Sequence, residues 1–391
     1  MTTTAITGIT ELTTQDEEHR VLHDAAIVID SGRIAWIGPA SQVPATDTSW
    51  DAEGRAVLPG WVDSHTHLVF AGDRSGEFEA RMAGQDYTAG GIGVTTGATR
   101  EASDVQLAEL ISARVAEAAR GGTTFLETKT GYGLSLQEEA RHARIAADAV
   151  DAVTYLGAHL VPPGADPEVY LDLVCGPMLE AVRPHVQWAD VFCERGAFDE
   201  DASRRVLTAC REAGLGLRVH GNQLGPGPGV RLAVELGAAS VDHVNHLTDD
   251  DVAALADSWS GAGADLGTVA TCLPACDLST RQPLAPARRL LDAGVPIALA
   301  SNCNPGTSYT TSMSFCVGTA VLQMGLSLHE SLRAATMGGA TALRVHHEVG
   351  SVEVGKRADL HVLDAPSAIH LAYRPGMPLT HAVFKDGRQT V

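Results

Sequence analysis

The sequence has few of the features that mark secreted, membrane-bound or disulfide-stabilised proteins. Its seven cysteines are scattered over 391 residues and include no CxxC pair, which is typical of reduced, buried thiols. Cys272 and Cys276 lie close together, but no second pair follows at zinc-finger spacing, so we expect no structural metal there. The N-terminus lacks a basic start, and no stretch approaches the about 20 apolar residues of a membrane helix. We therefore expect a cytoplasmic protein without a membrane role.

Positive charge is also scarce. The chain has 28 lysines and arginines against 48 aspartates and glutamates, a formal net charge of −20. Such a charge repels phosphate backbones and anionic bilayers, which argues against nucleic-acid or membrane partners. An anionic small molecule would need a local cationic clamp to bind. The 45% apolar content is enough for a sizeable core.

The two ends of the chain resemble each other and differ from the middle. Ala25–Gly38 holds two short apolar runs around an Asp-Ser-Gly turn, which predicts a hairpin. Gly350–Asp364 and His381–Val391 also show strand-and-turn patterns. We therefore predict that residues 1–57 and 350–391 form one small composite β-sandwich domain.

Residues 58–349 alternate apolar runs with amphipathic stretches. Such alternation predicts βαβ units, and about eight of them fit an α/β fold of the (β/α)8 barrel class, with the active site at the C-terminal ends of the strands. The expected strands are Trp61–Val69, Thr123–Thr128, Ala152–Ala158, Val186–Phe192, Gly216–His220, Ser240–His243, Gly267–Cys272 and Pro296–Ala300. The expected helices include Asp104–Arg120, Leu136–Asp148, Asp199–Ala213, Gly229–Leu236 and Ala285–Ala293.

Several histidines stand at the ends of predicted strands. His65 and His67, in LPGWVDSHTHLVF, are two residues apart, so both imidazoles face one side of the strand and can converge on a metal ion. His220 in LRVHGNQ is either a structural residue or a third ligand, which an open mononuclear site needs. His243 follows Asp242 and could orient a water and take its proton, or the two could pair for structural reasons alone.

Other strand ends carry residues suited to binding a substrate. Arg74 could clamp a carboxylate at the mouth of the site. Tyr132 lies on a glycine-flanked loop, and His159 could donate a hydrogen bond to the substrate. Backbone amides in the NPGT turn, with Asn304 and Thr307, could hold a carboxylate or carbonyl oxygen, although an ordinary turn has the same composition.

Taken together, these motifs resemble one known family. VDSHTHLVFAGDR, ATREAS, TKTGYGL, YLGAH, LRVHGNQ, VDH and NCNPGTS occur in the order and approximate spacing of the imidazolonepropionase family of amidohydrolases. The likeness runs from about Leu58 to the C-terminal GSVEVGKRADLHVLDAP. HxH and GKxADL are shared across the amidohydrolase superfamily, whereas GDR, KTGYGL and NPG are more specific to this family.

The resemblance implies hydrolysis of the cyclic amide of 4-imidazolone-5-propanoate to N-formimidoyl-L-glutamate in histidine degradation, by metal-activated water. It also implies one Zn²⁺ or Fe³⁺ ion per subunit and a homodimer. The metal ligands would be His65, His67 and His220. His243 would lie beside the attacked carbonyl. The substrate-binding residues would be Arg74, Tyr132, His159, Gln223, Asn304, Gly306 and Thr307.

Two positions depart from the family pattern. Gln223 stands where many members have a glutamate, and Asn302 stands where the strand usually ends in an aspartate that touches the metal. An asparagine can offer an oxygen to a metal, but it is neutral and cannot accept a proton. We expect Asn302 at the metal, Gln223 beside the catalytic centre, and His243 as the base.

Two alternatives remain open from the sequence. The chain could be a related amidohydrolase acting on another ring, such as a deaminase. It could also be a metal- or ligand-binding relative with impaired turnover, which Asn302 and Gln223 favour.

Overall fold

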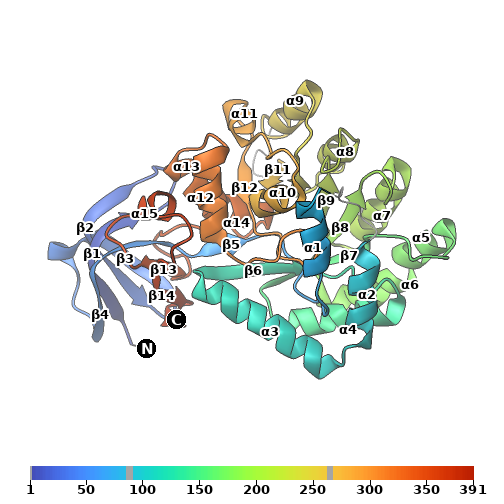
Figure 1. Ribbon diagram of the computed structural model, residues 1–391. Coiled ribbons are helices and arrows are strands. Elements are labelled where there is room, and N and C mark those ends of the chain that lie inside the picture. Colours follow the sequence, from blue (N-terminus) through green and yellow to red (C-terminus); the bar gives the residue numbers. More distant parts are fainter. Residues whose placement is uncertain (1, 85–90, 262–266) are drawn as a thin grey trace. The chain divides into compact units, whose positions relative to one another are not determined.

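The computed structural model describes residues 2–84, 91–261 and 267–391 and consists of two compact units (Figure 1). One unit comprises Met1–Asp63, Ala116–Phe125 and Ser312–Val391, and the other comprises Ser64–Val115 and Leu126–Thr311. The fold class is α/β, as predicted. The domain boundaries at residues 57 and 350 remain a prediction.

Strands from both ends of the chain share one mixed sheet. Among the described residues this sheet has seven strands in the order β15-β14-β13-β4-β1-β2-β3. β1 pairs antiparallel with β2 and parallel with β4, while β13 pairs antiparallel with both β4 and β14. The bounds are β1 Thr4–Thr13, β2 Val21–Asp30, β3 Arg33–Pro39, β4 Thr48–Pro59, β13 Leu360–Leu363, β14 Thr380–Lys385 and β15 Arg388–Gln389. The prediction that the two chain ends build one β-structure is confirmed.

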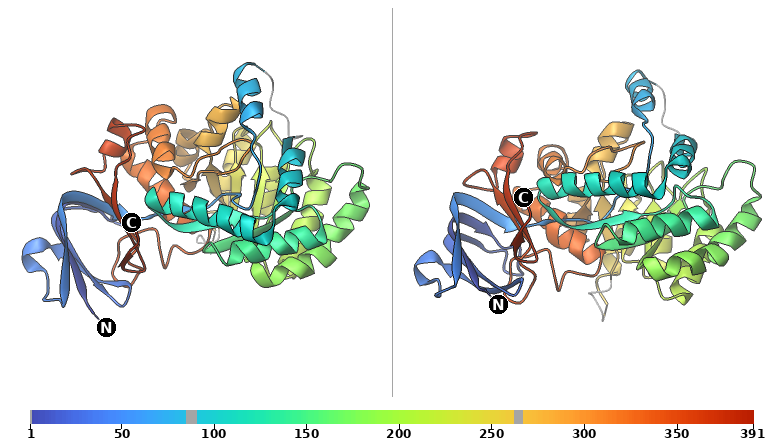
Figure 2. Two further views of the ribbon diagram at one scale, coloured as in Figure 1. Left: turned by 60° about the horizontal axis from the view of Figure 1, so that its bottom comes forward. Right: turned by 90° about the horizontal axis from the view of Figure 1, so that it is seen from below.

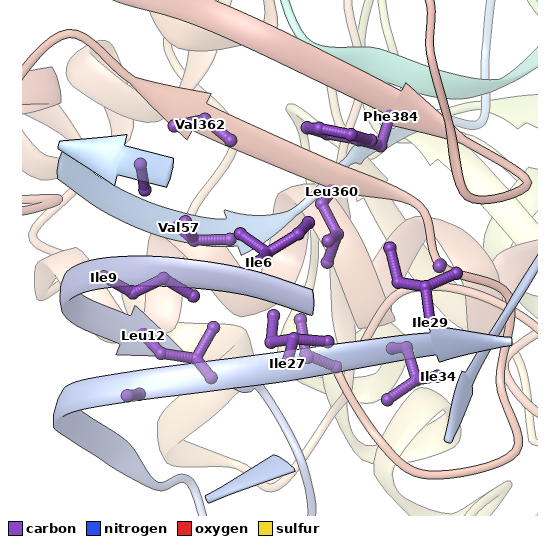
Figure 3. Packing of buried hydrophobic residues seen from close by; sticks show 14 of the residues in the cluster. Ile6, Ile9, Leu12, Ile27, Ile29, Ile34, Val57, Leu360, Val362 and Phe384 are labelled. Atoms are coloured by element: carbon purple, nitrogen blue, oxygen red, sulfur yellow. The ribbon is translucent and has the colours of Figure 1, made fainter. Parts of the chain in front are cut away.

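This sheet has its own apolar core, to which both chain ends contribute (Figure 3). Ile6 and Ile27 from the first strands are buried in the same cluster as Leu360, Val362 and Phe384 from the last ones. Burying such a side chain stabilises the fold by about 1.5–3 kcal/mol. The shared core therefore explains why the chain returns to this sheet after the barrel.

The hairpin between β2 and β3 requires glycine at its tip. Asp30 pairs with Arg33, so Ser31 and Gly32 form a two-residue loop, and both have positive φ angles of 54° and 80°. A Cβ on Gly32 would also lie 2.8 Å from the backbone oxygen of Asp386 in the last hairpin turn. The turn at this position thus depends on glycine both for its backbone conformation and for its space.

The second sheet is the barrel. Within the described ranges its eight strands follow the order β12-β11-β10-β9-β8-β7-β6-β5, and neighbours for which a register is defined pair in parallel. Figures 1 and 2 show α4 to α9 lying outside strands β6 to β11. The bounds are β5 Trp61–Asp63, β6 Thr123–Lys129, β7 Ala152–Ala158, β8 Trp188–Cys193, β9 Gly216–Gly221, β10 Ser240–His243, β11 Val269–Cys272 and β12 Ile297–Leu299. All eight predicted strands are present, and β7 and β10 have the predicted bounds.

The first predicted barrel strand is the one that differs most. It was expected to run from Trp61 to Val69, but β5 ends at Asp63. The following residues bond instead to the segment after β12: the His67 N–H donates to the Cys303 oxygen, and the Asn302 N–H donates to the His65 oxygen, both at 2.9 Å. These bonds hold His65 and His67 near the C-terminal ends of the other barrel strands.

Helix starts follow the capping residues of the sequence. Ser135 caps α4, Asp199 caps α7, and Thr248 and Asp251 form a capping box at α9. The bounds are α1 Ser75–Met82, α2 Ile92–Glu101, α3 Asp104–Arg120, α4 Leu136–Ala147, α5 Pro167–Cys175, α6 Pro177–Val182, α7 Glu200–Glu212, α8 Gly229–Glu235, α9 Asp249–Asp257, α10 Pro274–Thr280, α11 Ala287–Asp292, α12 Met313–Gln323, α13 Leu328–Arg333, α14 Gly339–Ala342 and α15 His370–Tyr373. In the described part of the chain, no helix combines the length and apolarity needed to cross a membrane.

Candidate active site

Four histidines gather at the strand ends. His65 and His67 follow β5, His220 lies on β9 and His243 ends β10. The ring centroid of His65 lies 4.5 Å from that of His220 and 5.3 Å from that of His67, and the rings of His220 and His243 are 5.3 Å apart. All four side chains are buried. The structure therefore brings together the histidines that the sequence selected.

Their nitrogens are placed where they could hold a cation. Nitrogens of His65, His220 and His243 lie within 4.8 Å of one another, whereas His67 is not part of this group. His65 Nε2, His67 Nδ1 and His243 Nδ1 are buried without a hydrogen-bond partner among the described residues, and so is Asn302 Oδ1. Leaving buried polar atoms unpaired is costly, and a cation would satisfy them. These residues fit a metal ion.

Two carboxylates orient two of these imidazoles. Asp242 Oδ2 lies 2.6 Å from His65 Nδ1, and Asp190 Oδ2 lies 3.0 Å from His220 Nδ1. An imidazole that donates Nδ1–H to a carboxylate presents its other nitrogen, Nε2, as an acceptor or ligand. Burial alone would raise the pKa of Asp242, but Arg218 and His65 hold it well below its usual range. Asp242 is therefore a carboxylate that supports His65.

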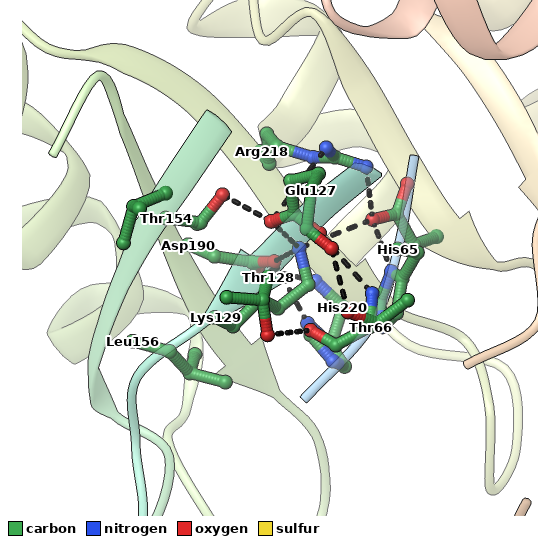
Figure 4. A network of polar contacts seen from close by, with 12 residues as sticks. His65, Thr66, Glu127, Thr128, Lys129, Thr154, Leu156, Asp190, Arg218 and His220 are labelled. Atoms are coloured by element: carbon green, nitrogen blue, oxygen red, sulfur yellow. Dashed lines mark hydrogen bonds and ion pairs between the residues drawn. The ribbon is translucent and has the colours of Figure 1, made fainter. Parts of the chain in front are cut away.

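Beneath the histidines lies a set of charged side chains that we call the buried-charge cluster (Figure 4). Lys129 Nζ lies 3.1 Å from both Glu127 Oε1 and Asp190 Oδ2, and Arg218 Nη2 lies 2.9 Å from Asp242 Oδ2. All of these side chains are at most 1% exposed. The members of the buried-charge cluster are Glu127, Lys129, Asp190, Arg218 and Asp242.

Sequence reasoning missed most of this cluster, although a signal was present. Glu127 and Lys129 are two residues apart at the end of a predicted strand, so they share one face if the strand continues to Lys129, and Arg218 and His220 share one face of another strand. Asp190 interrupts an apolar run. A charged residue inside a barrel strand needs a partner of opposite charge. From this rule one could have predicted that the charged residues of β6, β8 and β9 contact one another.

The backbone is strained at two residues of the site. His243 and Asn302 have φ angles of 84° and 51°, and Val244, which is β-branched, has a φ of 52°. Non-glycine residues rarely adopt such angles, and they cost of order 1–3 kcal/mol each. The chain turns sharply at these strand ends, which places both side chains at the pocket.

A pocket opens above the histidines. Ten of its lining residues were predicted from the sequence, whereas the apolar residues Ile92 and Phe192 were not, because nothing distinguishes them from core residues. Two predicted site residues, His65 and Gly306, are not among those that line it. The predicted lining residues are His67, Arg74, Tyr132, His159, His220, Gln223, His243, Asn302, Asn304 and Thr307.

Arg74 is the cationic side chain of this pocket. Its Nε and Nη2 donate to Glu77 at 2.9 and 2.7 Å. Its Nη1 lies against Gly306, since a Cβ on that glycine would come within 2.2 Å of Nη1. The guanidinium is thus held in place by Glu77, and the absence of a side chain at Gly306 leaves room for it.

The NPGT turn uses its amides differently from the prediction. The N–H groups of Gly306 and Thr307 donate to Asn304 Oδ1 at 2.9 and 2.8 Å. The side-chain amide of Asn304 in turn donates to the backbone oxygen of Asn302 at 2.7 Å. Because Asn304 already occupies both amides, they are not open to a carboxylate, and the turn instead fixes the shape of the pocket wall.

His159 also differs from the expected donor. Its Nδ1 lies 2.9 Å from the Gly131 oxygen, and burial lowers its pKa to about 4. The ring is therefore neutral and donates Nδ1–H to the backbone, which leaves Nε2 as an acceptor. Its ring stacks on that of His67 at 5.7 Å, and Tyr132 lies 5.5 Å from it.

Cys276 contacts Gln223 and Asn302, the two amide residues that stand where the family pattern has carboxylates. Gln223 Nε2 donates to its Sγ at 3.9 Å, and the side chain of Asn302 also bonds the thiol. Burial raises the pKa of Cys276 to about 12, so it is a neutral thiol.

His243, Cys276 and Asp277 form a second group whose ligand atoms lie within 4.8 Å of one another, but Asp277 already accepts the Ala285 N–H. All seven cysteines are free, as expected.

Comparison with known proteins agrees with the fold and identifies the family. Residues 56–390 match the amidohydrolase family. The structure resembles an adenosine deaminase from Xanthomonas campestris with bound zinc (TM-score 0.71, 19% identity, covering 99% of this chain and 92% of that one). It also resembles a mutant atrazine chlorohydrolase from Arthrobacter aurescens TC1 complexed with zinc and atraton (TM-score 0.74, 19% identity, 99% and 95% covered). At these identities the likeness shows the fold alone. The chain is therefore an amidohydrolase whose barrel carries a histidine triad able to hold a metal.

Curated relatives define the family more narrowly. The chain is 71% identical to an imidazolonepropionase from Arthrobacter sp. strain FB24 over 98% of both proteins. It is 69% identical to one from Micrococcus luteus over the full length of both, and 65% identical to one from Saccharopolyspora erythraea over 99% of this chain and 98% of that protein. The chain belongs to the imidazolonepropionase family, with the hydrolase function of that family. This result favours imidazolonepropanoate hydrolysis over the two alternatives that the sequence left open, a related amidohydrolase acting on another ring and a binding protein with impaired turnover.

Proposed function

We propose that His65, His67 and His220 hold one zinc or iron ion, with Asn302 Oδ1 beside them. Two observations support this ligand set: the unpaired buried atoms of His65, His67 and Asn302, and the zinc bound by proteins of similar fold. Such an ion acts as a Lewis acid and lowers the pKa of water toward neutrality. The substrate is the anionic 4-imidazolone-5-propanoate, and the product is N-formimidoyl-L-glutamate. A homodimer follows from the family resemblance.

His243 is the base of this reaction. Burial and the neighbouring His220 lower its pKa well below its usual value, so the ring is neutral before the reaction. As a weak base it would take a proton only from a water that the bound ion has made more acidic. No carboxylate competes for this role at position 302, where the amide is neutral. Gln223 lines the same pocket and can hydrogen-bond the substrate without taking a proton. The proton of the attacking water thus passes to His243 and from there to the leaving ring nitrogen.

Arg74 binds the propanoate carboxylate. Its guanidinium is the cationic group in the pocket lining, so it gives an anionic substrate a local positive partner in a chain of net charge −20. His159 Nε2 accepts a ring N–H of the imidazolone, and Tyr132 packs against the ring. Asn304, Gly306 and Thr307 shape the wall against the propanoate arm, since their turn is closed by its own hydrogen bonds.

Hydrolysis of freshly prepared imidazolonepropanoate, followed by loss of absorbance, tests the function directly. Wild type is expected to turn over, and Asn302→Asp is expected to bind the metal about tenfold more tightly, because a carboxylate adds a negative ligand. If wild type is inert and Asn302→Asp is active, the natural chain only binds its ligand and the proposal is wrong.

Substitution of Gly306 tests the carboxylate clamp. Gly306→Ala places a Cβ where Arg74 Nη1 lies and should displace the guanidinium. We expect KM to rise about tenfold or more with a smaller change in kcat, since binding of the remote carboxylate is lost. Gly76→Ala is the matched control, because an added Cβ there meets nothing within 4 Å. An unchanged KM in Gly306→Ala would exclude Arg74 as the clamp.

A further inference from the structure

The buried-charge cluster is not electrically balanced. Its three carboxylates, Glu127, Asp190 and Asp242, face two cations, Lys129 and Arg218, which leaves one net negative charge. The side chains are 0–1% exposed, so water does not screen this charge. A buried unpaired charge is costly unless a charge of opposite sign compensates it.

The excess charge faces the histidines. Asp242 Oδ2 contacts Arg218 at 2.9 Å and His65 Nδ1 at 2.6 Å, whereas Lys129 is 4.0 Å away. Asp242 Oδ1 and His65 Nε2 are buried without a hydrogen-bond partner among the described residues. Asp190 Oδ2 lies 3.0 Å from His220 Nδ1, and Asp190 Oδ1 accepts the backbone N–H of His220 at 3.0 Å. Each imidazole therefore lies between a carboxylate and the point where the histidine nitrogens converge.

Because position 302 carries a neutral asparagine, the negative charge that a bound cation needs has to come from another residue. With three neutral imidazoles and the neutral amide of Asn302, the proposed ligands carry no negative charge. Asn302 cannot supply one, because its carboxamide side chain is neutral and cannot ionise. A divalent or trivalent cation in a buried site needs nearby negative charge.

We propose that the buried-charge cluster supplies, through Asp242 under His65 and Asp190 under His220, the negative charge that Asn302 does not give to the cation. Lys129 and Arg218 act as positioning residues: Lys129 contacts Asp190 at 3.1 Å and Arg218 contacts Asp242 at 2.9 Å, so each cation holds one carboxylate in place. This inference rests on the proposed function, in which His65 and His220 hold the metal. A carboxylate one imidazole away strengthens the ligand's basicity, and its loss typically costs 10- to 100-fold in metal affinity.

A double-mutant cycle between positions 242 and 302 tests the inference. The readouts are the zinc dissociation constant, measured by competition with a chelator, and the melting temperature of the same samples. Asp242→Asn should weaken zinc binding about 10- to 100-fold. Asn302→Asp should restore most of that affinity in the double variant, and its effect should be larger there than in wild type, because one charge replaces the other.

Controls separate charge from folding. Asp359→Asn makes the same change at a buried aspartate in the seven-stranded-sheet unit, 3.0 Å from Arg357, and should leave zinc affinity unchanged whatever it does to the melting temperature. Asp242→Glu keeps the charge and should lie nearer to wild type than Asp242→Asn. Should Asp242→Asn fail to fold, Asp190→Asn carries the same test at His220.

The outcomes distinguish the two proposals. If wild type binds no zinc, the metal site itself is wrong. If wild type binds one zinc and the folded Asp242→Asn or Asp190→Asn stays within about twofold of it, the site holds and this inference is overturned. A variant that loosens zinc but is not rescued by Asn302→Asp would also contradict it, since geometry rather than charge would then be the cause.

Discussion

Replacing His243 with asparagine is expected to lower kcat by about 10²- to 10⁴-fold, the usual contribution of a positioned proton acceptor. Asparagine keeps a polar group of similar reach but cannot take a proton. The loss of activity should be large because residue 302, which lines the same pocket, is an asparagine and cannot accept the proton instead. Steady-state kinetics with imidazolonepropanoate measure kcat and KM, and metal analysis of the same preparation gives the ion content.

Metal content decides what a loss of activity means in that variant. His243 Nδ1 is buried and has no hydrogen-bond partner in the part of the chain that the structure describes, and His243 also belongs to the group of nitrogens that lie within 4.8 Å of one another. If His243→Asn is inactive but keeps one ion per chain, the residue is the base. If the ion is lost as well, His243 is a ligand, and the assignment of the base has to change.

Replacing His220 with alanine is expected to abolish both stoichiometric metal binding and measurable turnover. His220 is the histidine whose ring lies within 5.5 Å of all three others, and Asp190 fixes its orientation. An open mononuclear site needs three protein donors, so removal of a central one leaves too few. Metal analysis after dialysis, together with the kinetic assay, gives the result.

His246→Ala is the matched control for this substitution. His246 follows the same strand as His243 but contacts Gln282 at 3.4 Å and is not a lining residue of the pocket. Its replacement should leave metal content and turnover close to wild type. Metal retention and full activity in His220→Ala would show that the ion, if bound, is held elsewhere.

The sequence predicted the strands that carry the site because short apolar runs, each ending in a polar residue, are a local signal. Ala152–Ala158 and Ser240–His243 have the predicted bounds. The histidines were predicted from the same local signal, although His65 and His67 follow β5 and are placed by hydrogen bonds to the segment after β12. Strands and strand-end histidines could therefore be predicted from the sequence, because each depends on a short stretch of neighbouring residues.

What depends on contacts between distant segments was not predicted. The buried-charge cluster joins residues of four strands, and no single stretch shows that Lys129 meets Asp190. The tautomer of His159 depends on a carbonyl 28 residues earlier in the chain, at Gly131. The amides of the NPGT turn were misassigned because the competing acceptor, the Asn304 side chain, becomes evident only once the turn is folded.

Metal analysis of the purified wild-type chain by mass spectrometry, paired with its activity before and after chelation, tests the central claim most directly. The account predicts about one zinc or iron per chain, loss of turnover when a chelator removes it, and recovery when the ion is returned. Full turnover by a chain that carries no stoichiometric metal would contradict it.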